Sequence, residues 1–126
     1  MRLTVLYPGS HESFAAEARL RLSRIRNLDL AWVSTEPSSF QEDLAEVAAS
    51  EDPLVLVLHS SPIEGLKLPP RLLWAPLLSR IEAGQAGSIG VCLLNSIALP
   101  PLFKQAKVAQ EPNSIRALNQ WILRWL

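Results

Sequence analysis

The sequence predicts a three-layer α/β sandwich around a parallel sheet of about five strands. Short apolar segments typical of strands alternate with longer segments whose apolar residues recur at helical spacing. Two of the short segments, residues 54–58 and 88–94, are apolar throughout, as expected for parallel strands covered on both faces. Glycine and proline separate many of these segments. Together these observations predict a flavodoxin-like, doubly wound fold.

The first strand is predicted at residues 2–7, where Pro8 and Gly9 end an apolar, β-branched segment. Ser10 is the expected N-cap of the helix that follows. The side chains expected to be buried on this helix are Phe14, Ala18, Leu22 and Ile25. Acidic residues come early in the segment and arginines late, an order that complements the helix dipole.

A second strand is predicted at residues 28–34, followed by a loop over residues 34–38. Ser39 and Glu42 match a capping box, which predicts a helix from there to about residue 50. Its expected buried side chains are Phe40, Leu44, Val47 and Ala48. The strand at residues 54–58 is expected at the centre of the sheet.

The second half of the chain predicts two more strands and two more helices. Because proline damages a helix interior, Pro76 predicts a short turn at residues 72–74 and a separate helix over residues 75–83. Strands are expected at residues 88–94 and, at the edge of the sheet, 106–109. A last helix is predicted from Ser114, its N-cap, to the C-terminus, with Ile115, Leu118, Ile122 and Trp125 buried.

Length and charge narrow the functional classes. A chain of 126 residues is expected to form a single domain, residues 1–126. Its 12 basic and 12 acidic residues cancel, so we expect neither nucleic acid nor an anionic membrane as a partner. The N-terminus has no long apolar segment typical of a signal peptide, and we expect a cytoplasmic protein.

The known chemical motifs are incomplete in this sequence. It contains neither a phosphate-binding loop motif nor the glycine-rich dinucleotide motif. One cysteine, Cys92, and two separated histidines do not form a zinc motif, so no metal or resident cofactor is expected. A hydrolase triad using Ser60 or Ser61 with His59 or His11 lacks the usual nucleophile elbow. Cys92 is expected to be a buried core residue.

The order of these segments resembles a bacterial TIR (Toll/interleukin-1 receptor) domain over nearly the whole chain. Residues 7–14, which lead from the first strand into a serine- and acid-containing turn, are similar to the first conserved box of that family. Trp74 lies where family members often carry a tryptophan at the start of their third helix. The proline-containing turn at residues 99–102, after the fourth strand, also matches the family.

The resemblance implies two kinds of function. Some TIR domains are scaffolds that self-associate through the loop after the second strand, which here contains Glu36 and Pro37. Others cleave NAD+ with a glutamate about one turn after the tryptophan, where this chain has Leu77 and Leu78. Leucine can neither bind the ribose hydroxyls nor stabilise an oxocarbenium-like transition state.

We therefore expect a non-catalytic interaction domain of a bacterial signalling or defence protein, with other protein domains or a second copy as partners. Besides Glu36 and Pro37, the candidate contact residues are Trp121, Trp125, Leu126, Leu72, Leu73 and Leu102. The alternative is an NAD+ glycohydrolase that uses Glu82 or Glu64, with Ser10 and Ser34 as ligand-binding residues and NAD+ as substrate. A third hypothesis is a flavin-binding protein of flavodoxin type, which would be yellow.

Overall fold

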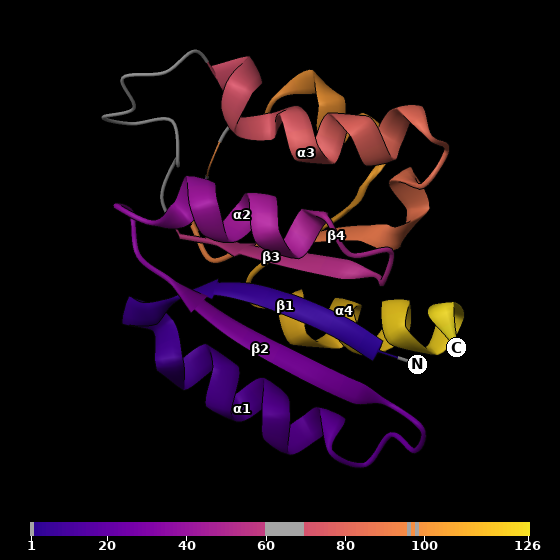
Figure 1. Cartoon of the computed structure of the whole chain (residues 1–126). Coiled ribbons are helices and arrows are strands. Elements are labelled where there is room, and N and C mark those ends of the chain that lie inside the picture. Colours follow the sequence, from indigo (N-terminus) through magenta and orange to yellow (C-terminus); the bar gives the residue numbers. More distant parts are fainter. Residues whose placement is uncertain (1, 60–69, 96, 98) are drawn as a thin grey trace.

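The computed structural model describes residues 2–59, 70–95, 97 and 99–126. Within these ranges, five strands form one parallel sheet in the order β2-β1-β3-β4-β5, with helices on both faces (Figure 1). The strands are β1 (Arg2–Pro8), β2 (Asp29–Thr35), β3 (Leu54–Leu58), β4 (Ile89–Leu93) and β5 (Lys107–Gln110). The helices are α1 (Glu12–Leu22), α2 (Phe40–Ala48), α3 (Pro70–Glu82) and α4 (Ser114–Trp125). The predicted doubly wound α/β fold is confirmed.

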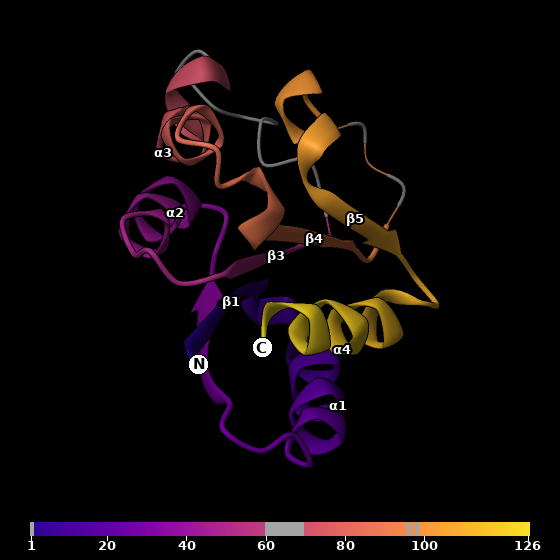
Figure 2. The same cartoon turned by 90° about the vertical axis from the view of Figure 1, so that its right-hand side faces the viewer.

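Helices α2 and α3 cover one face of the sheet, and α1 and α4 cover the other (Figure 2). Successive side chains of a strand point to opposite faces, so each covered strand must be apolar throughout. In β3, Leu54 and Leu56 pack toward α2 and α3, whereas Val55 and Val57 pack toward α1 and α4. None of the β3 side chains is more than 3% exposed, which explains the continuous apolar segment.

Helix α4 packs unusually close to β4 because Gly90 has no side chain. A Cβ atom at Gly90 would lie 2.7 Å from the Trp121 ring. Trp121 is therefore only 7% exposed, and the prediction that it lies on an exposed contact surface was wrong. The same holds for Leu73, which is 1% exposed and packs in the core beneath α3.

The helix starts differ from the expected ones. Helix α1 is preceded by a 3-10 turn, Gly9–His11, so its N-cap is His11 and not Ser10. Ser39 does occupy the N-cap position of α2, but its hydroxyl donates to the Asp43 carboxylate at 2.9 Å and makes no cap hydrogen bond to the backbone. The N-cap of α4 is Asn113, and Ser114 is the first residue inside the helix.

Pro76 does not divide α3, contrary to expectation. The helix runs from Pro70 to Glu82 because Leu73, Trp74 and Leu77, on both sides of the proline, are buried in the same core. The helix ends at Glu82, one residue before the predicted end, and Gly84 follows with a φ of 81°, which favours glycine. Hydrogen bonds from the Gly84 and Gln85 amides to carbonyls of the last turn close this end, as in a Schellman motif.

Candidate functional site

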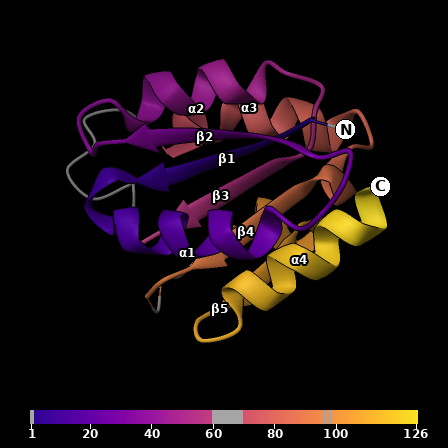
Figure 3. The same cartoon turned by 90° about the horizontal axis from the view of Figure 1, so that it is seen from below.

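The carboxyl ends of the parallel strands lie together at one edge of the sheet, here called the carboxyl edge (Figure 3). The strand order changes direction at β1, which lies between β2 and β3. Folds of this kind bind ligands outside the strand ends at such a switch point. In this chain the residues there are Ser10 and His11, after β1, and His59, directly after β3.

His11 and His59 form a stacked imidazole pair at this switch point. Their ring centroids lie 4.1 Å apart with an interplanar angle of 37°, and the Ser10 hydroxyl lies 3.0 Å from His11 Nδ1. Burial, together with the charge of His59, lowers the pKa of His11, and the Glu111 carboxylate opposes this shift. His11 is therefore mostly neutral at pH 7 and can accept a proton or a hydrogen bond.

The Glu36 carboxylate lies against the turn that follows β1, at Gly9. In this position the Glu36 carboxylate occupies the space that a Cβ atom at Gly9 would need. The preceding residue, Thr35, donates a hydrogen bond of 2.7 Å to Asp43 in α2, and Ser39 donates one of 2.9 Å to the same oxygen. These bonds fix both ends of the loop of residues 36–39, here called the β2–α2 loop.

A second polar cluster fixes the start of α1 on the sheet. The Tyr7 hydroxyl donates to Glu12 at 2.7 Å, and Arg19 lies over the Trp32 ring at 5.1 Å from its centroid. Burial of Tyr7 is the main cause of its raised pKa, and the Glu12 carboxylate adds to the shift. The cluster links β1, α1 and β2, and its polar groups are engaged with one another. We assign it a structural role.

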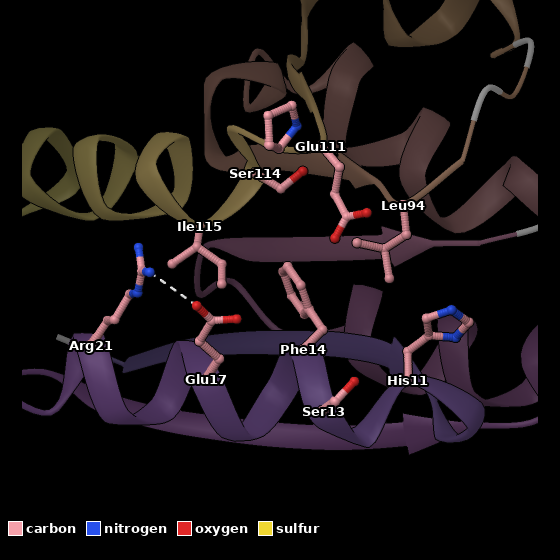
Figure 4. A pocket seen from close by; sticks show the side chains of 10 residues that line it. His11, Ser13, Phe14, Glu17, Arg21, Leu94, Glu111, Ser114 and Ile115 are labelled. Atoms are coloured by element: carbon pink, nitrogen blue, oxygen red, sulfur yellow. Dashed lines mark hydrogen bonds and ion pairs between the residues drawn. The ribbon is translucent and has the colours of Figure 1, made fainter.

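A cavity of about 400 Å³ opens between α1 and the start of α4 (Figure 4). Phe14, Leu94 and Ile115 supply apolar side chains, and the Glu111 carboxylate points into the space between the two helices. One end is bounded by His11 and the other by the ion pair of Glu17 and Arg21, which lie 2.9 Å apart. Sequence reasoning missed this cavity, because it is formed by residues from three separate parts of the chain.

Of the two glutamates considered for NAD+ cleavage, the structure describes Glu82, and it does not lie at the switch point. Glu82 is exposed at the end of α3, beside the amino ends of the strands. Two residues earlier, Arg80 donates hydrogen bonds to the Asp52 carbonyl, just before β3, and to the Ser88 hydroxyl, just before β4. Ser10 lies at the opposite edge of the sheet. Glu64, like Ser60 and Ser61, lies outside the described residues.

The other candidate residues are distributed over several surfaces. Ser10 and Ser34 are both exposed near the carboxyl edge, and Ser34 pairs in register with Tyr7. Glu36 and Pro37 are exposed in the β2–α2 loop. Trp125 is half-buried and donates its indole N–H to the Gly87 carbonyl at 2.9 Å. Leu72 and Leu126 are exposed, whereas Leu102 is partly buried against the core.

Sequence reasoning named His11 and His59 separately but did not predict that they stack, and it did not name Glu111. Each of the three follows a strand, so the strand ends were the available signal. The strand order needed to bring them together cannot be read from spacing alone. Among the described residues, no group of three or more His, Cys, Asp or Glu side chains could hold a metal ion, and no helix is long and apolar enough to cross a membrane.

Comparison with known proteins gives a fold and no family. No family model matches the chain, and no curated protein matches it. A solved structure named "putative lipoprotein from Peptoclostridium difficile 630 (fragment)" is similar to it, with a TM-score of 0.57 and 10% sequence identity. The match covers 98% of this chain and 96% of that chain. At this identity, the likeness supports the flavodoxin-like α/β fold alone.

Proposed function

We propose that the chain is a TIR-like interaction domain of a bacterial signalling or defence protein, which acts by binding other protein domains, including a second copy of itself. The contact is made by the β2–α2 loop, with Glu36 and Pro37 at its exposed surface. We also propose a cytoplasmic location. No nucleic-acid partner is proposed, because the net charge of the chain is zero.

This proposal is supported by the hydrogen bonds that hold the exposed β2–α2 loop at both of its ends. Its exposed residues stand between two anchors, because Thr35 at one end and Ser39 at the other both donate to Asp43. An exposed loop that is already ordered loses little conformational entropy on binding, so more of its contact energy remains as affinity. This is the property expected of a contact loop.

The alternative of NAD+ cleavage is less well supported. Glu82 and Ser10 lie at opposite edges of the sheet, so Glu82 cannot act on a ligand held by the Ser10 turn. Of the two leucines that stand where the catalytic glutamate is expected, Leu77 is fully buried and Leu78 is 39% exposed. The Glu36 carboxylate, which lies against Gly9 in the turn after β1, belongs to the loop that we assign to protein contact.

Sedimentation analysis from micromolar to millimolar concentration tests the proposal. We expect reversible association of the wild-type protein, and an association constant lowered about tenfold or more in Glu36→Arg, because charge reversal at the contact replaces attraction with repulsion. Glu82→Arg makes the same charge change at the opposite edge and should associate like the wild type. If the wild-type protein stays monomeric at all concentrations, self-association is rejected. If both variants lower the association constant equally, the β2–α2 loop is rejected as the contact.

A further inference from the structure

The cavity between α1 and α4 is separate from the β2–α2 loop, and it carries an unpaired negative charge. In the described part of the chain, the Glu111 side chain makes no hydrogen bond or ion pair, although its charge acts on His11. Its carboxylate points into the cavity (Figure 4). Since the other carboxylate of the cavity, Glu17, is already paired with Arg21, Glu111 is the free anionic group.

The charge balance of the cavity favours a cation. The residues that line the cavity include two carboxylates, Glu17 and Glu111, and one guanidinium, Arg21. His11 adds little positive charge at neutral pH, since its pKa is lowered. The first turn of α4 contributes only about half a positive charge. The sum is negative, so an anionic ligand would be repelled.

The remaining surface of the cavity suits an alkyl chain. Phe14 is 7% exposed and forms an apolar floor, while Leu94 and Ile115 are partly buried on either side. Long basic side chains bury their methylene stems on such surfaces and keep the charged end at a polar group. A stem lying on Phe14 and Ile115 would bring its charged end to Glu111 (Figure 4).

We propose that this cavity accepts a lysine side chain of a partner protein, with the stem on Phe14, Leu94 and Ile115 and the ammonium group at the Glu111 carboxylate. Ser114 lines the same cavity, is 1% exposed, and has a hydroxyl without a hydrogen-bond partner among the described residues. It adds a polar group beside Glu111. This inference rests on the proposed function, because it takes the ligand to be part of a contacting protein.

The test uses Nα-acetyl-lysine methylamide as the probe and amide NMR shifts of the wild-type protein as the readout. We expect saturable, millimolar binding, with shifts at Leu94, Ser114 and Ile115. The same compound acetylated on its side-chain nitrogen keeps the stem and loses the charge, so it should not bind. Glu111→Gln should weaken binding about tenfold or more, because it removes a charge-assisted hydrogen bond.

Glu82→Gln is the matched control, since it removes an exposed carboxylate at the opposite edge of the sheet and should bind like the wild type. Glu111 is exposed, so its substitution is not expected to disturb folding, and the amide spectrum of the free variant checks this. Shifts that do not saturate, equal binding of the acetylated compound, or unchanged binding by Glu111→Gln would each overturn the lysine site.

The outcome is independent of self-association, because the probe is a small molecule and the readout is local. Saturable binding by a protein that stays monomeric would retain the lysine site and leave self-association through the β2–α2 loop rejected. Association that depends on Glu36, without probe binding, would retain the proposed function and reject the lysine site.

Discussion

Cys92 shows how position in the sheet decides the chemistry of a residue. It lies in β4 with no exposed surface, and burial raises its pKa to about 12. Because only the thiolate is a good nucleophile, the thiol should not react with a disulfide reagent at pH 8 while the protein is folded. We expect labelling only in denaturant or at the rate of unfolding. Rapid stoichiometric labelling of the native protein would contradict this burial.

His11 should make stability depend on pH in a defined direction. Its folded-state pKa is below the ordinary value of 6.5, mainly because of burial, so the unfolded chain binds more protons in the window between the two values. Stability should therefore fall as the pH drops from 6.5 to the folded pKa. Denaturant unfolding across this window should show a shallower slope for His11→Gln. Equal slopes for the wild type and for His11→Gln would contradict a lowered pKa of His11 in the folded protein.

NAD+ provides a further test at the level of single residues. With Leu77 and Leu78 at the expected glutamate position and Glu82 at the opposite edge, we expect no free nicotinamide when concentrated protein is incubated with NAD+. Proton NMR over time measures this directly. Nicotinamide release that is lost in Glu64→Gln or Glu82→Ala would show an enzyme and contradict the proposed interaction domain.

At the scale of elements, the contact between β4 and α4 depends on Gly90. An added methyl group would lie 2.7 Å from the rigid Trp121 ring, so Gly90→Ala should lower the free energy of unfolding by about 1–3 kcal/mol. Gly87→Ala is the control, because no atom lies within 4 Å of a Cβ there, and a change within about 0.5 kcal/mol is expected. Denaturant unfolding compares the two, and equal effects would contradict the close packing.

The sequence predicted the positions of the elements better than their ends. Periodicity identified the strands and the buried faces of α1 and α2, which pack on the sheet. Ile25, expected on the first helix, was wrongly placed there, because α1 ends at Leu22. Helix starts depend on which hydrogen bond a short side chain makes. Ser39 bonds to Asp43, and Ser10 lies beside His11. Pro76 was misjudged because packing of α3 on the core outweighs the missing backbone hydrogen bond.

For the whole molecule, the alternation of strands and helices was sufficient to predict the fold class, but not the site. Strand order decides which strand ends become neighbours, and it brings His11 next to His59 across 48 positions of sequence. The cavity at Glu111 likewise needs α1 and α4 on the same face of the sheet. Such juxtapositions depend on long-range packing, which local patterns do not contain.

The same reasoning explains the misassigned tryptophan. A periodic pattern marks the apolar face of α4, but Trp121 and Trp125 lie one turn apart on neighbouring parts of that face. The sheet accepts Trp121 only because Gly90 leaves room for it, and Trp125 remains half-buried with its N–H bonded to Gly87. Which of the two is buried therefore depends on a glycine in another element.

Concentration-dependent amide NMR tests whether the β2–α2 loop is the contact surface of this domain. As the concentration rises, we predict that the amide shifts of Glu36 and Ser38 change progressively, and that those of Glu82 and its neighbours stay constant. If no amide shift changes up to millimolar concentration, or if the changes centre on the end of α3, the β2–α2 loop is not the contact surface.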